Sequence, residues 1–327
     1  MRKKISSDQI AELAQVSQST MSRAFDPDSN VSAKTRKKVL DIANEFNYKP
    51  SALARGLITN KSKLIGIAMK EKQNPFYYEV LSLFTQKLKD HGFSVLFVHT
   101  ENEEIQQKEI AKFWEYNVEA IIVTDAFLSS DLVKKLKNAN IPVILFNREN
   151  EDLQCNTVSS DNIYASQSIA KYFYNKKHKK ILYVSGNHNT STNRDRFYGF
   201  NSFFKQKNEE IEVIKGDYTF ETAYQLTLDY LKAGNIPDAI FGANDITALG
   251  VLEAVKEIGL NIPDEVEIIG FDDIKMASWP NYQLTTWSQP LETIVNETIK
   301  ILLKGDLNTN RRIKIKGNFK FRSTTSN

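Results

Sequence analysis

Hydrophobic positions along the chain follow two different patterns, and the change falls near residue 63. Before it, apolar residues recur at three- and four-residue spacing in three short stretches, which is typical of amphipathic helices. From Leu64 onward, short runs rich in Val, Ile and Leu alternate with longer helical stretches. The pattern therefore predicts a small all-α head followed by a larger α/β body.

Each helix predicted in the head begins after a serine that can cap it. Ser6, with Gln9 three residues later, has the spacing of a capping box. Ser17 precedes the second helix, 18–25, and Ser32 precedes the third. The apolar residues of these helices are expected to face inward: Ile10, Ala11, Leu13, Ala14, Met21, Ala24, Phe25, Val39, Ile42, Ala43 and Phe46.

The body reads as alternating strands and helices. We expect strands at 64–69, 94–98, 120–124, 142–146, 181–185, 239–243 and 267–271. We expect helices at about 76–91, 103–116, 131–138, 164–175, 196–206, 222–231 and 246–258. Such alternation indicates parallel sheets covered on both faces. Because these units are too many for one compact sheet, we predict two doubly wound lobes split near residue 160, with ligands bound at the carboxyl ends of the strands.

Charge is distributed unevenly between the two parts. Residues 1–63 hold twelve Lys and Arg against six Asp and Glu, a net charge of +6, whereas the rest of the chain carries −3. A basic head on a slightly acidic body suggests a polyanionic partner for the head. A merely solvated basic tail is the alternative that charge by itself leaves open.

The remaining composition narrows the class of protein. No apolar segment follows the basic start, and the longest apolar runs are too short to span a bilayer, so we expect a cytoplasmic protein. The single cysteine, Cys155, excludes an internal disulfide. The four histidines lack metal-ligand spacing, and we find no phosphate-binding glycine loop or nucleophile elbow. We therefore expect no metal, no cofactor and no enzymatic activity.

Residues 8–23 have the spacing of a helix-turn-helix. Ala11 lets two helices cross closely, Val16 fills the turn, and Met21 packs beneath the second helix. The outward positions of that second helix are short and polar or basic: Gln18, Ser19, Ser22 and Arg23. Gln and Arg side chains can form paired hydrogen bonds with base edges in a major groove. The segment is therefore a candidate DNA-reading element.

Ordered motifs along the chain resemble the LacI/GalR family of bacterial regulators. In the head they are Val16-Ser-x-x-Thr20-x-Ser22-Arg23, Val31-Ser-x-x-Thr35-Arg36-x-x-Val39, Asn47-Tyr48-x-Pro50 and Ala54-Arg55-Gly56-Leu57. In the body they include Asn74-Pro75-Phe76-Tyr77, Arg196-Phe-Tyr-Gly199-Phe200, Asn244-Asp245-x-x-Ala248-x-Gly250, Gly270-Phe271-Asp272-Asp273 and Leu284-Thr285-Thr286-Trp287. The resemblance spans nearly all of the chain and implies a body like that of periplasmic binding proteins.

The resemblance assigns DNA contacts within the head. Gln18, Ser19 and Arg23 take the positions that read bases. A further set takes phosphate or packing positions: Ser17, Thr20, Ser22, Thr35 and Arg36. For Ser17 a plain helix cap is an equal alternative, and for residues 36–38 a solvated helix face is the alternative.

Residues 51–57 resemble the family's hinge helix, which orders on DNA. Ala54 is small enough for two such helices to touch in a dimer, and Leu57 takes the position of a wedge inserted into the minor groove. The alternative is a simple linker with a buried leucine.

Effector contacts carry over to seven positions in the body: Phe76, Asn147, Asp161, Arg196, Tyr218, Asn244 and Asp272. Carboxylates, amides and aromatic faces of this kind suit the hydroxyls and the apolar face of a sugar ring. Phe220 is a second choice as a stacking face. Arg148 either pairs with an acidic sugar or faces solvent.

Three positions depart from the family pattern. Gln15 stands where the family usually has a glycine in a left-handed backbone, so we expect modest strain there. Asn147 stands where several relatives have an acidic residue, which changes the expected hydroxyl contacts. The pair Gln18-Ser19 differs from well-known members, so an operator sequence cannot be transferred from them.

The resemblance also sets the expected domains. Residues 1–48 form the head, 49–63 the hinge helix and linker, 64–160 with about 289–318 the N-terminal lobe, and 161–288 with about 319–327 the C-terminal lobe.

The leading hypothesis is a homodimeric repressor of a palindromic operator, controlled by a small carbohydrate-like effector in the cleft between the lobes. Whether the effector releases or tightens the operator complex stays open. A second hypothesis adds a protein partner or co-repressor. A third, from another class, is a solute-binding receptor or an enzyme of similar body fold.

Overall fold

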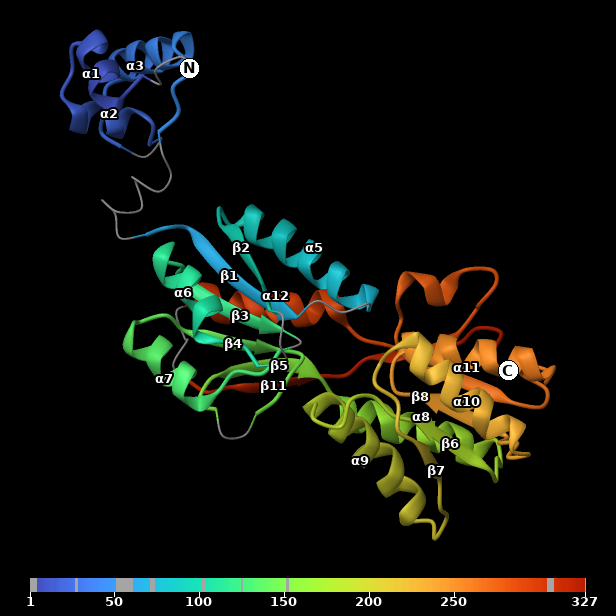
Figure 1. The fold of residues 1–327 in the computed structure, drawn as a ribbon. Coiled ribbons are helices and arrows are strands. Elements are labelled where there is room, and N and C mark those ends of the chain that lie inside the picture. The colour runs from blue at the N-terminus through green and yellow to red at the C-terminus, as the bar shows by residue number, and fades with distance from the viewer. Residues whose placement is uncertain are drawn as a thin grey trace. The chain divides into compact units, whose positions relative to one another are not determined.

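The computed structural model describes residues 5–26, 29–50, 61–70, 74–100, 104–124, 126–150, 153–304 and 309–326. The chain forms two compact units, the head at residues 1–63 and the body at residues 64–327 (Figure 1). The hinge helix expected at 51–57, with Ala54 and Leu57, lies outside the described residues.

The head consists of three short helices: α1 (Ser7–Ala14), α2 (Gln18–Ala24) and α3 (Ala33–Glu45). The predicted caps are present, since Ser6 and Gln9 form a capping box and Ser17 and Ser32 accept backbone N–H groups. The fully buried residues of the head are all small or aliphatic, apart from one methionine: Ile10, Ala11, Ala14, Met21, Ala24, Val39 and Ala43.

Two apolar residues predicted to face the head's core lie on its surface instead. Leu13 is 48% exposed and Phe46 is 45% exposed. α1 has only eight residues, and Ile10, Ala11 and Ala14 already fill its contact face. Phe46 is the C-cap residue of α3, so it lies beyond the last packed turn.

The turn between α1 and α2 has the backbone expected at its first residue. Gln15 adopts a left-handed conformation with φ 54° and ψ 46°, and its N–H donates to carbonyls of α1. A residue with a side chain in this conformation costs some backbone strain.

The first lobe of the body is built on a six-stranded parallel sheet in the order β11-β5-β4-β3-β1-β2. Its strands are β1 (Leu64–Lys70), β2 (Ser94–Thr100), β3 (Ala120–Thr124), β4 (Val143–Phe146), β5 (Asn156–Ser160) and β11 (Arg312–Ile315). Its helices are α5 (Pro75–Asp90), α6 (Gln107–Glu115), α7 (Ser130–Asn138) and α12 (Leu291–Leu303). α5 and α12 pack into one core cluster, and α6 and α7 pack into another.

The second lobe has a six-stranded sheet in the order β12-β10-β9-β8-β6-β7, parallel except for β12. Its strands are β6 (Ile181–Val184), β7 (Glu212–Ile214), β8 (Ala239–Gly242), β9 (Glu267–Asp272), β10 (Thr285–Ser288) and β12 (Asn318–Lys320). Its helices are α8 (Asn162–Asn175), α9 (Ser191–Lys205), α10 (Phe220–Lys232) and α11 (Asp245–Ile258), with a short 3-10 helix η1 (Lys275–Ser278).

The predicted fold class, a helical head with two doubly wound lobes, is confirmed. The chain passes between the lobes three times, after β5, after β10 and after β11. The sequence pattern did not predict β5, β7, β10, β11, β12 or α12. β5 shows why: its residues Asn-Thr-Val-Ser-Ser are mostly polar, yet all five are buried.

Candidate functional site

α2 presents a polar surface in the head. Gln18, Ser19, Ser22 and Arg23 are all exposed, as expected of a helix that reads DNA. The two long side chains are held by local hydrogen bonds, since Gln18 Nε2 donates to Ser7 Oγ at 3.3 Å and Arg23 Nε donates to Ser19 O at 3.2 Å. Both bonds are exposed to solvent and lie at the long end of the hydrogen-bond range, so they hold these side chains only weakly.

Ser17 serves as the cap of α2. Its Oγ accepts the N–H of Thr20 at 3.2 Å and lies within hydrogen-bond distance of the Ser19 and Thr20 hydroxyls. Thr35 has the same relation to Ser32 at the start of α3. Both threonine hydroxyls are therefore engaged at helix N-termini, which also favour the approach of a phosphate.

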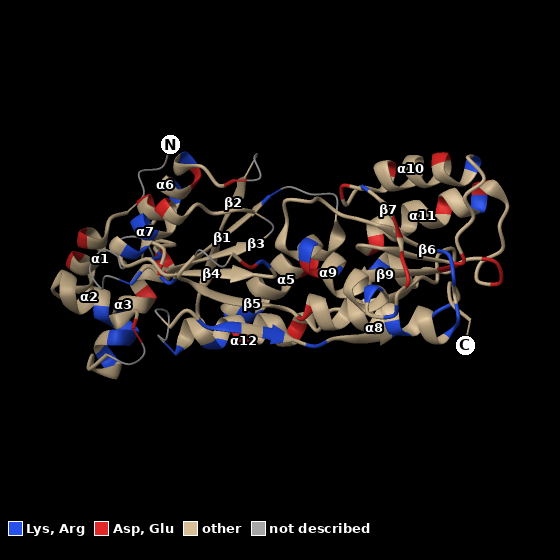
Figure 2. Ribbon diagram, turned by 90° about the horizontal axis from the view of Figure 1, so that it is seen from below, with Lys and Arg blue, Asp and Glu red and all other residues tan. Residues whose placement is uncertain are grey.

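Arg36 has a role that the sequence did not predict. Its Nη1 donates to the carbonyls of Ala24 (3.2 Å) and Asp26, and its Nη2 donates to Ser29 O at 3.0 Å and Ser29 Oγ at 3.1 Å. Both terminal nitrogens of the guanidinium thus hold the connection between α2 and α3. The neighbouring Lys34, Lys37 and Lys38 are exposed, and the Lys and Arg positions of α3 are coloured blue on the ribbon in Figure 2.

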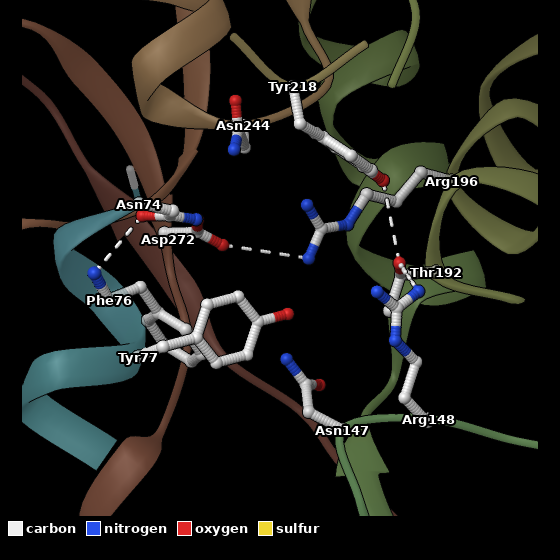
Figure 3. Close-up of a pocket in the computed structure, with 10 residues that line it drawn as sticks. All are labelled: Asn74, Phe76, Tyr77, Asn147, Arg148, Thr192, Arg196, Tyr218, Asn244 and Asp272. Atoms are coloured by element: carbon white, nitrogen blue, oxygen red, sulfur yellow. Dashed lines mark hydrogen bonds and ion pairs between the residues drawn. The ribbon is translucent and has the colours of Figure 1, made fainter. Parts of the chain in front are cut away.

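The body contains a pocket between its two lobes, with about 330 Å³ of space that includes an opening to solvent. Its walls come from the segments that follow β1, β4, β6, β7 and β8 and from the last residue of β9, which is where ligands bind in doubly wound folds. Ten residues line it: Asn74, Phe76, Tyr77, Asn147, Arg148, Thr192, Arg196, Tyr218, Asn244 and Asp272 (Figure 3).

Asp272, the last residue of β9, is the polar centre of the pocket. Its Oδ2 accepts Asn74 Nδ2 at 3.0 Å, and its Oδ1 accepts Gln289 Nε2 at 2.6 Å. Arg196 Nη2 lies 3.6 Å from Oδ1. With only 6% of Asp272 exposed, these contacts compensate the burial of the carboxylate.

Arg196 is fixed in place by α8, by the residue that follows β8 and by β9. Its Nε donates to Asn162 Oδ1 at 2.9 Å, its Nη1 donates to Ala243 O at 2.6 Å, and its guanidinium lies 3.6 Å from the centre of the Phe271 ring. A planar cation stacked on an aromatic face and bonded at several nitrogens is rigidly oriented. Arg196 can therefore present a fixed donor edge to a bound molecule.

Tyr218 forms an aromatic wall of the pocket and depends on a glycine. A Cβ on Gly186 would lie 2.0–2.3 Å from three atoms of the Tyr218 ring, so only glycine leaves room for it. Tyr218 itself has a left-handed φ of 62°. Asn147 (φ 53°) and Asp272 (φ 128°) are also in this sparsely populated region. Backbone strain of this kind concentrates at binding sites.

Direct hydrogen bonds link the two lobes at the pocket. Asn74 donates to Asp272 across the cleft, Arg148 Nη1 donates to Thr192 Oγ1 at 3.1 Å, and Glu149 N donates to Ser191 Oγ at 2.9 Å. Thr192 Oγ1 lies 3.4 Å from the Tyr218 hydroxyl. The lobes therefore meet through residues that also form the pocket walls.

Six of the seven residues expected to contact an effector line this pocket; the exception is Asp161. Asp161 caps α8 by accepting the N–H of Tyr164 at 3.1 Å. Phe220, the second choice for stacking, is not among the lining residues either. Arg148 is 5% exposed and lines the pocket, so the alternative that it faces solvent is wrong.

Asn74, Tyr77 and Thr192 were not expected in the pocket. The motif 74–77 could have indicated Asn74 and Tyr77, because it follows the first strand and begins a helix, and ligands bind at such positions in doubly wound folds. Thr192 lies four residues before Arg196, on the same face of α9, which is the spacing that could have indicated it.

Other functional classes receive no support from the described residues. In the described ranges, no three His, Cys, Asp or Glu side chains are grouped so as to hold a metal ion. Cys155 is buried, and burial raises the pKa of its thiol to about 11, which makes it a poor nucleophile. None of the helices in the described part of the chain has the length and apolar character needed to cross a membrane.

Known families match both units. The family described as bacterial regulatory proteins, lacI family, matches residues 8–51, and the periplasmic binding protein domain matches residues 65–278. The repressor PurR of Photobacterium profundum is 29% identical over 311 residues, covering 93% of each chain. The catabolite control protein A of Priestia megaterium is 27% identical, covering 90% of each chain.

Solved structures show the same fold. A lac repressor dimer bound to operator and the anti-inducer ONPF superposes with a TM-score of 0.88 at 23% identity, covering 99% of this chain and 100% of that one. A complex of the regulator CelR with cellobiose gives a TM-score of 0.71 at 20% identity, covering 98% and 99%. The chain thus belongs to the LacI family of bacterial transcription regulators: it joins a DNA-binding head to a ligand-binding domain of the periplasmic-binding-protein type, and it is not an enzyme.

Proposed function

We propose that this chain is a homodimeric repressor of a palindromic operator, and that a small carbohydrate-like effector in the interlobe pocket controls its affinity for the operator. The observation that carries the effector half is the pocket itself, in which three aromatic rings and seven polar side chains converge from two lobes. Such a wall suits a compact ring with several hydroxyl groups.

The polar groups of the pocket fit vicinal hydroxyls. Asp272 accepts, Arg196 donates, and the amides of Asn74, Asn147 and Asn244 do both. The solved relative CelR binds cellobiose, a carbohydrate. We propose six direct effector contacts, at Phe76, Asn147, Arg196, Tyr218, Asn244 and Asp272, with Asp161 acting through the start of α8.

On the DNA side, we propose base contacts from Gln18, Ser19 and Arg23. Ser17, Thr20, Ser22 and Thr35 are proposed to face phosphates at the starts of α2 and α3, and Ala54 and Leu57 to act in the hinge. Arg36 is proposed to act mainly by holding the connection between α2 and α3.

The proposed boundaries are those given above: the head to residue 48, a linker to residue 63, and lobes that divide at about 160, 289 and 318.

Selection from genomic DNA fragments tests the operator half. We expect an inverted repeat, and affinity that falls steeply with salt because the basic head displaces counterions. Arg23→Ala should weaken specific binding, while Lys207→Ala, an exposed substitution on the body, should not. Binding without sequence preference would contradict the proposal.

A thermal-shift and calorimetry panel tests the effector half. Its members are D-ribose, D-glucose, cellobiose, D-galacturonate and hypoxanthine, because a bound ligand raises the apparent melting temperature. A sugar that binds and changes operator affinity supports the proposal, and the direction of the change separates induction from co-repression. If only hypoxanthine binds, the proposed carbohydrate effector is wrong and the pocket takes a flat heterocycle instead.

A further inference from the structure

Asp245 lies outside the pocket but beside its central carboxylate. It is the first residue of α11, directly after the pocket residue Asn244, and it is 0% exposed. Its Oδ2 accepts the N–H of Ile274 at 2.8 Å, and its Oδ1 accepts the hydroxyl of Thr286 at 2.5 Å. The carboxylate therefore ties the start of α11 to the segment after β9 and to β10.

The segment that Asp245 holds has an unusual backbone. Asp272 and Asp273 have φ values of 128° and 61°, so two consecutive residues with side chains occupy a region that favours glycine. Such a conformation persists only where its surroundings impose it. The contacts that impose it are the bond from Ile274 N–H to Asp245 and the pair of Arg322 Nη2 with Asp273 Oδ1 at 2.6 Å.

β9 is shaped to receive the Asp245 carboxylate. A Cβ on Gly270 would lie 2.3 Å from Asp245 Oδ1, so the carboxylate occupies the space that a side chain would fill two residues before Asp272. The carboxylate thus contacts β9 on one side of Asp272 and bonds the following segment on the other side. The position of Asp272 is defined between these two contacts.

We propose that Asp245 is a positioning residue for effector binding, which sets where the Asp272 carboxylate lies in the pocket without touching the effector. This inference rests on the proposed function, in which Asp272 binds the effector, and deepens it by naming the group on which that contact depends. Asp245 acts through Ile274 N–H and the Thr286 hydroxyl.

The same arrangement makes the pocket sensitive to pH near neutrality. The charged groups around Asp245 are Asp272 on β9, which is paired with Arg196, and Asp273, which is paired with Arg322. Burial, and then the charge of Asp272, raise the pKa of Asp245 to about 7. Protonation gives Asp245 an O–H donor, which the Ile274 N–H cannot accept, whereas the Thr286 hydroxyl can reverse its bond and accept it.

The side-chain amides of Asn74 and Gln289 report the position of Asp272 without any effector. Both donate to its carboxylate, Asn74 to Oδ2 and Gln289 to Oδ1. In the full chain with labelled Asn and Gln, their NH₂ resonances are assigned by the variants Asn74→Asp and Gln289→Glu. We expect Asp245→Asn to shift both resonances and Thr286→Val to shift them in the same direction by less.

Asp238→Asn is the matched control. Asp238 also accepts two backbone N–H groups, those of Lys179 and Lys180, but at the opposite end of the same sheet. It should leave both resonances in place. If Asp245→Asn and Thr286→Val lower the melting temperature but leave both resonances unmoved, Asp245 is structural only and the inference is overturned. Thr286→Val retains the carboxylate, so it decides the matter if Asp245→Asn does not fold.

Two further readouts complete the test. In the wild-type chain both resonances should move with pH around a midpoint of about 7, and in Asp245→Asn they should not. Wild-type resonances that stay constant from pH 5.5 to 8.5 would overturn the pH dependence.

For whichever of D-ribose, D-glucose or D-galacturonate binds the wild type, Asp245→Asn should weaken binding about tenfold, as loss of an orienting partner does elsewhere. If none of these sugars binds, the proposed effector class fails, while the resonances still decide the role of Asp245.

Discussion

At the scale of single residues, the pocket depends on glycines, which leave space for neighbouring side chains, as much as on the side chains that line it. Gly186 contributes no side chain, and the Tyr218 ring fills the space that its Cβ would take. Gly270 has the same relation to the Asp245 carboxylate. Sequence reasoning identified Tyr218 through a family position, but it had no means of pairing Tyr218 with Gly186, because 32 residues of chain separate them.

Gly186→Ala should therefore damage the pocket more than the fold. The new methyl group meets the Tyr218 ring, and overpacking of this kind costs about 1–3 kcal/mol. We expect a lower melting temperature and loss of effector binding. Adding Tyr218→Ala removes the obstacle and should recover stability but not binding, a non-additivity that a double-mutant cycle measures. Equal losses in the single and the double variant would contradict the contact.

The Asp245 carboxyl should also leave a mark on stability. Its pKa in the folded chain, about 7, lies above its ordinary value of 3.8, so between these two values the folded state binds more protons than the unfolded state. Stability contributed by this group is therefore full below about pH 4 and is lost as pH rises toward 7. Asp245→Asn should abolish this decline in chemical unfolding measured from pH 4 to 8. A difference between the two proteins that grows as pH falls below 4 would have the wrong sign.

At the scale of elements, a strand could be predicted from the sequence where its buried residues are also apolar. β1, β3 and β4 are mostly aliphatic and fully or largely buried, and the sequence predicted each of them to within a residue or two. β5 is equally buried but polar, and two of its side chains form hydrogen bonds: Ser159 Oγ donates to Glu149 Oε1, and Asn156 Oδ1 accepts the N–H of Arg311. A buried strand made of polar residues does not show the apolar run on which strand prediction depends.

The head illustrates the same limit for a charged residue. Arg36 lies between the basic residues Lys34 and Lys37 on a basic helix, so its sequence context suggested either phosphate contact or solvent. The fold instead brings the carbonyls of Ala24, Asp26 and Ser29 to its guanidinium. Ala24 is the last residue of α2, and Asp26 and Ser29 lie in the connection to α3, which has no regular structure that a periodic pattern could predict.

Arg36→Ala should consequently destabilise the head. It leaves several carbonyls without their charged donor, a loss of about 1.5–3 kcal/mol, and a head with so small a core should unfold at clearly lower temperature. Lys37→Ala is the control, because Lys37 is 78% exposed and its ion pair with Asp41 lies in solvent, where such pairs contribute little to stability. Thermal unfolding of the helical head, followed by circular dichroism, compares the two variants with the wild type. A variant that loses operator affinity with unchanged stability would instead assign Arg36 to the phosphates.

At the scale of the whole body, the two lobes are joined by three chain crossings and by hydrogen bonds between pocket residues. The seven expected effector positions were predicted one at a time, and six of them meet in one pocket, but the bonds from Arg148 to Thr192 and from Glu149 to Ser191 belong to no motif. They arise only when both lobes are folded and adjacent. Ser191 and Thr192 both lie in the first turn of α9, so one short segment carries half of this contact.

Removing these acceptors should therefore favour separation of the lobes. Two hydrogen bonds together contribute about 2 kcal/mol, enough to raise the open population more than about tenfold. In the double variant Ser191→Ala, Thr192→Val we expect faster amide hydrogen exchange in peptides covering 145–150 and 186–193, with exchange in the core strands unchanged. Ser202→Ala is the control on the same helix, because its hydroxyl bonds the carbonyl of Gly199 within α9. If the double variant exchanges like the wild type, the three crossings and the bond from Asn74 to Asp272 are sufficient to hold the lobes together. An effector would then have to act by bending those crossings rather than by competing for Arg148 and Thr192.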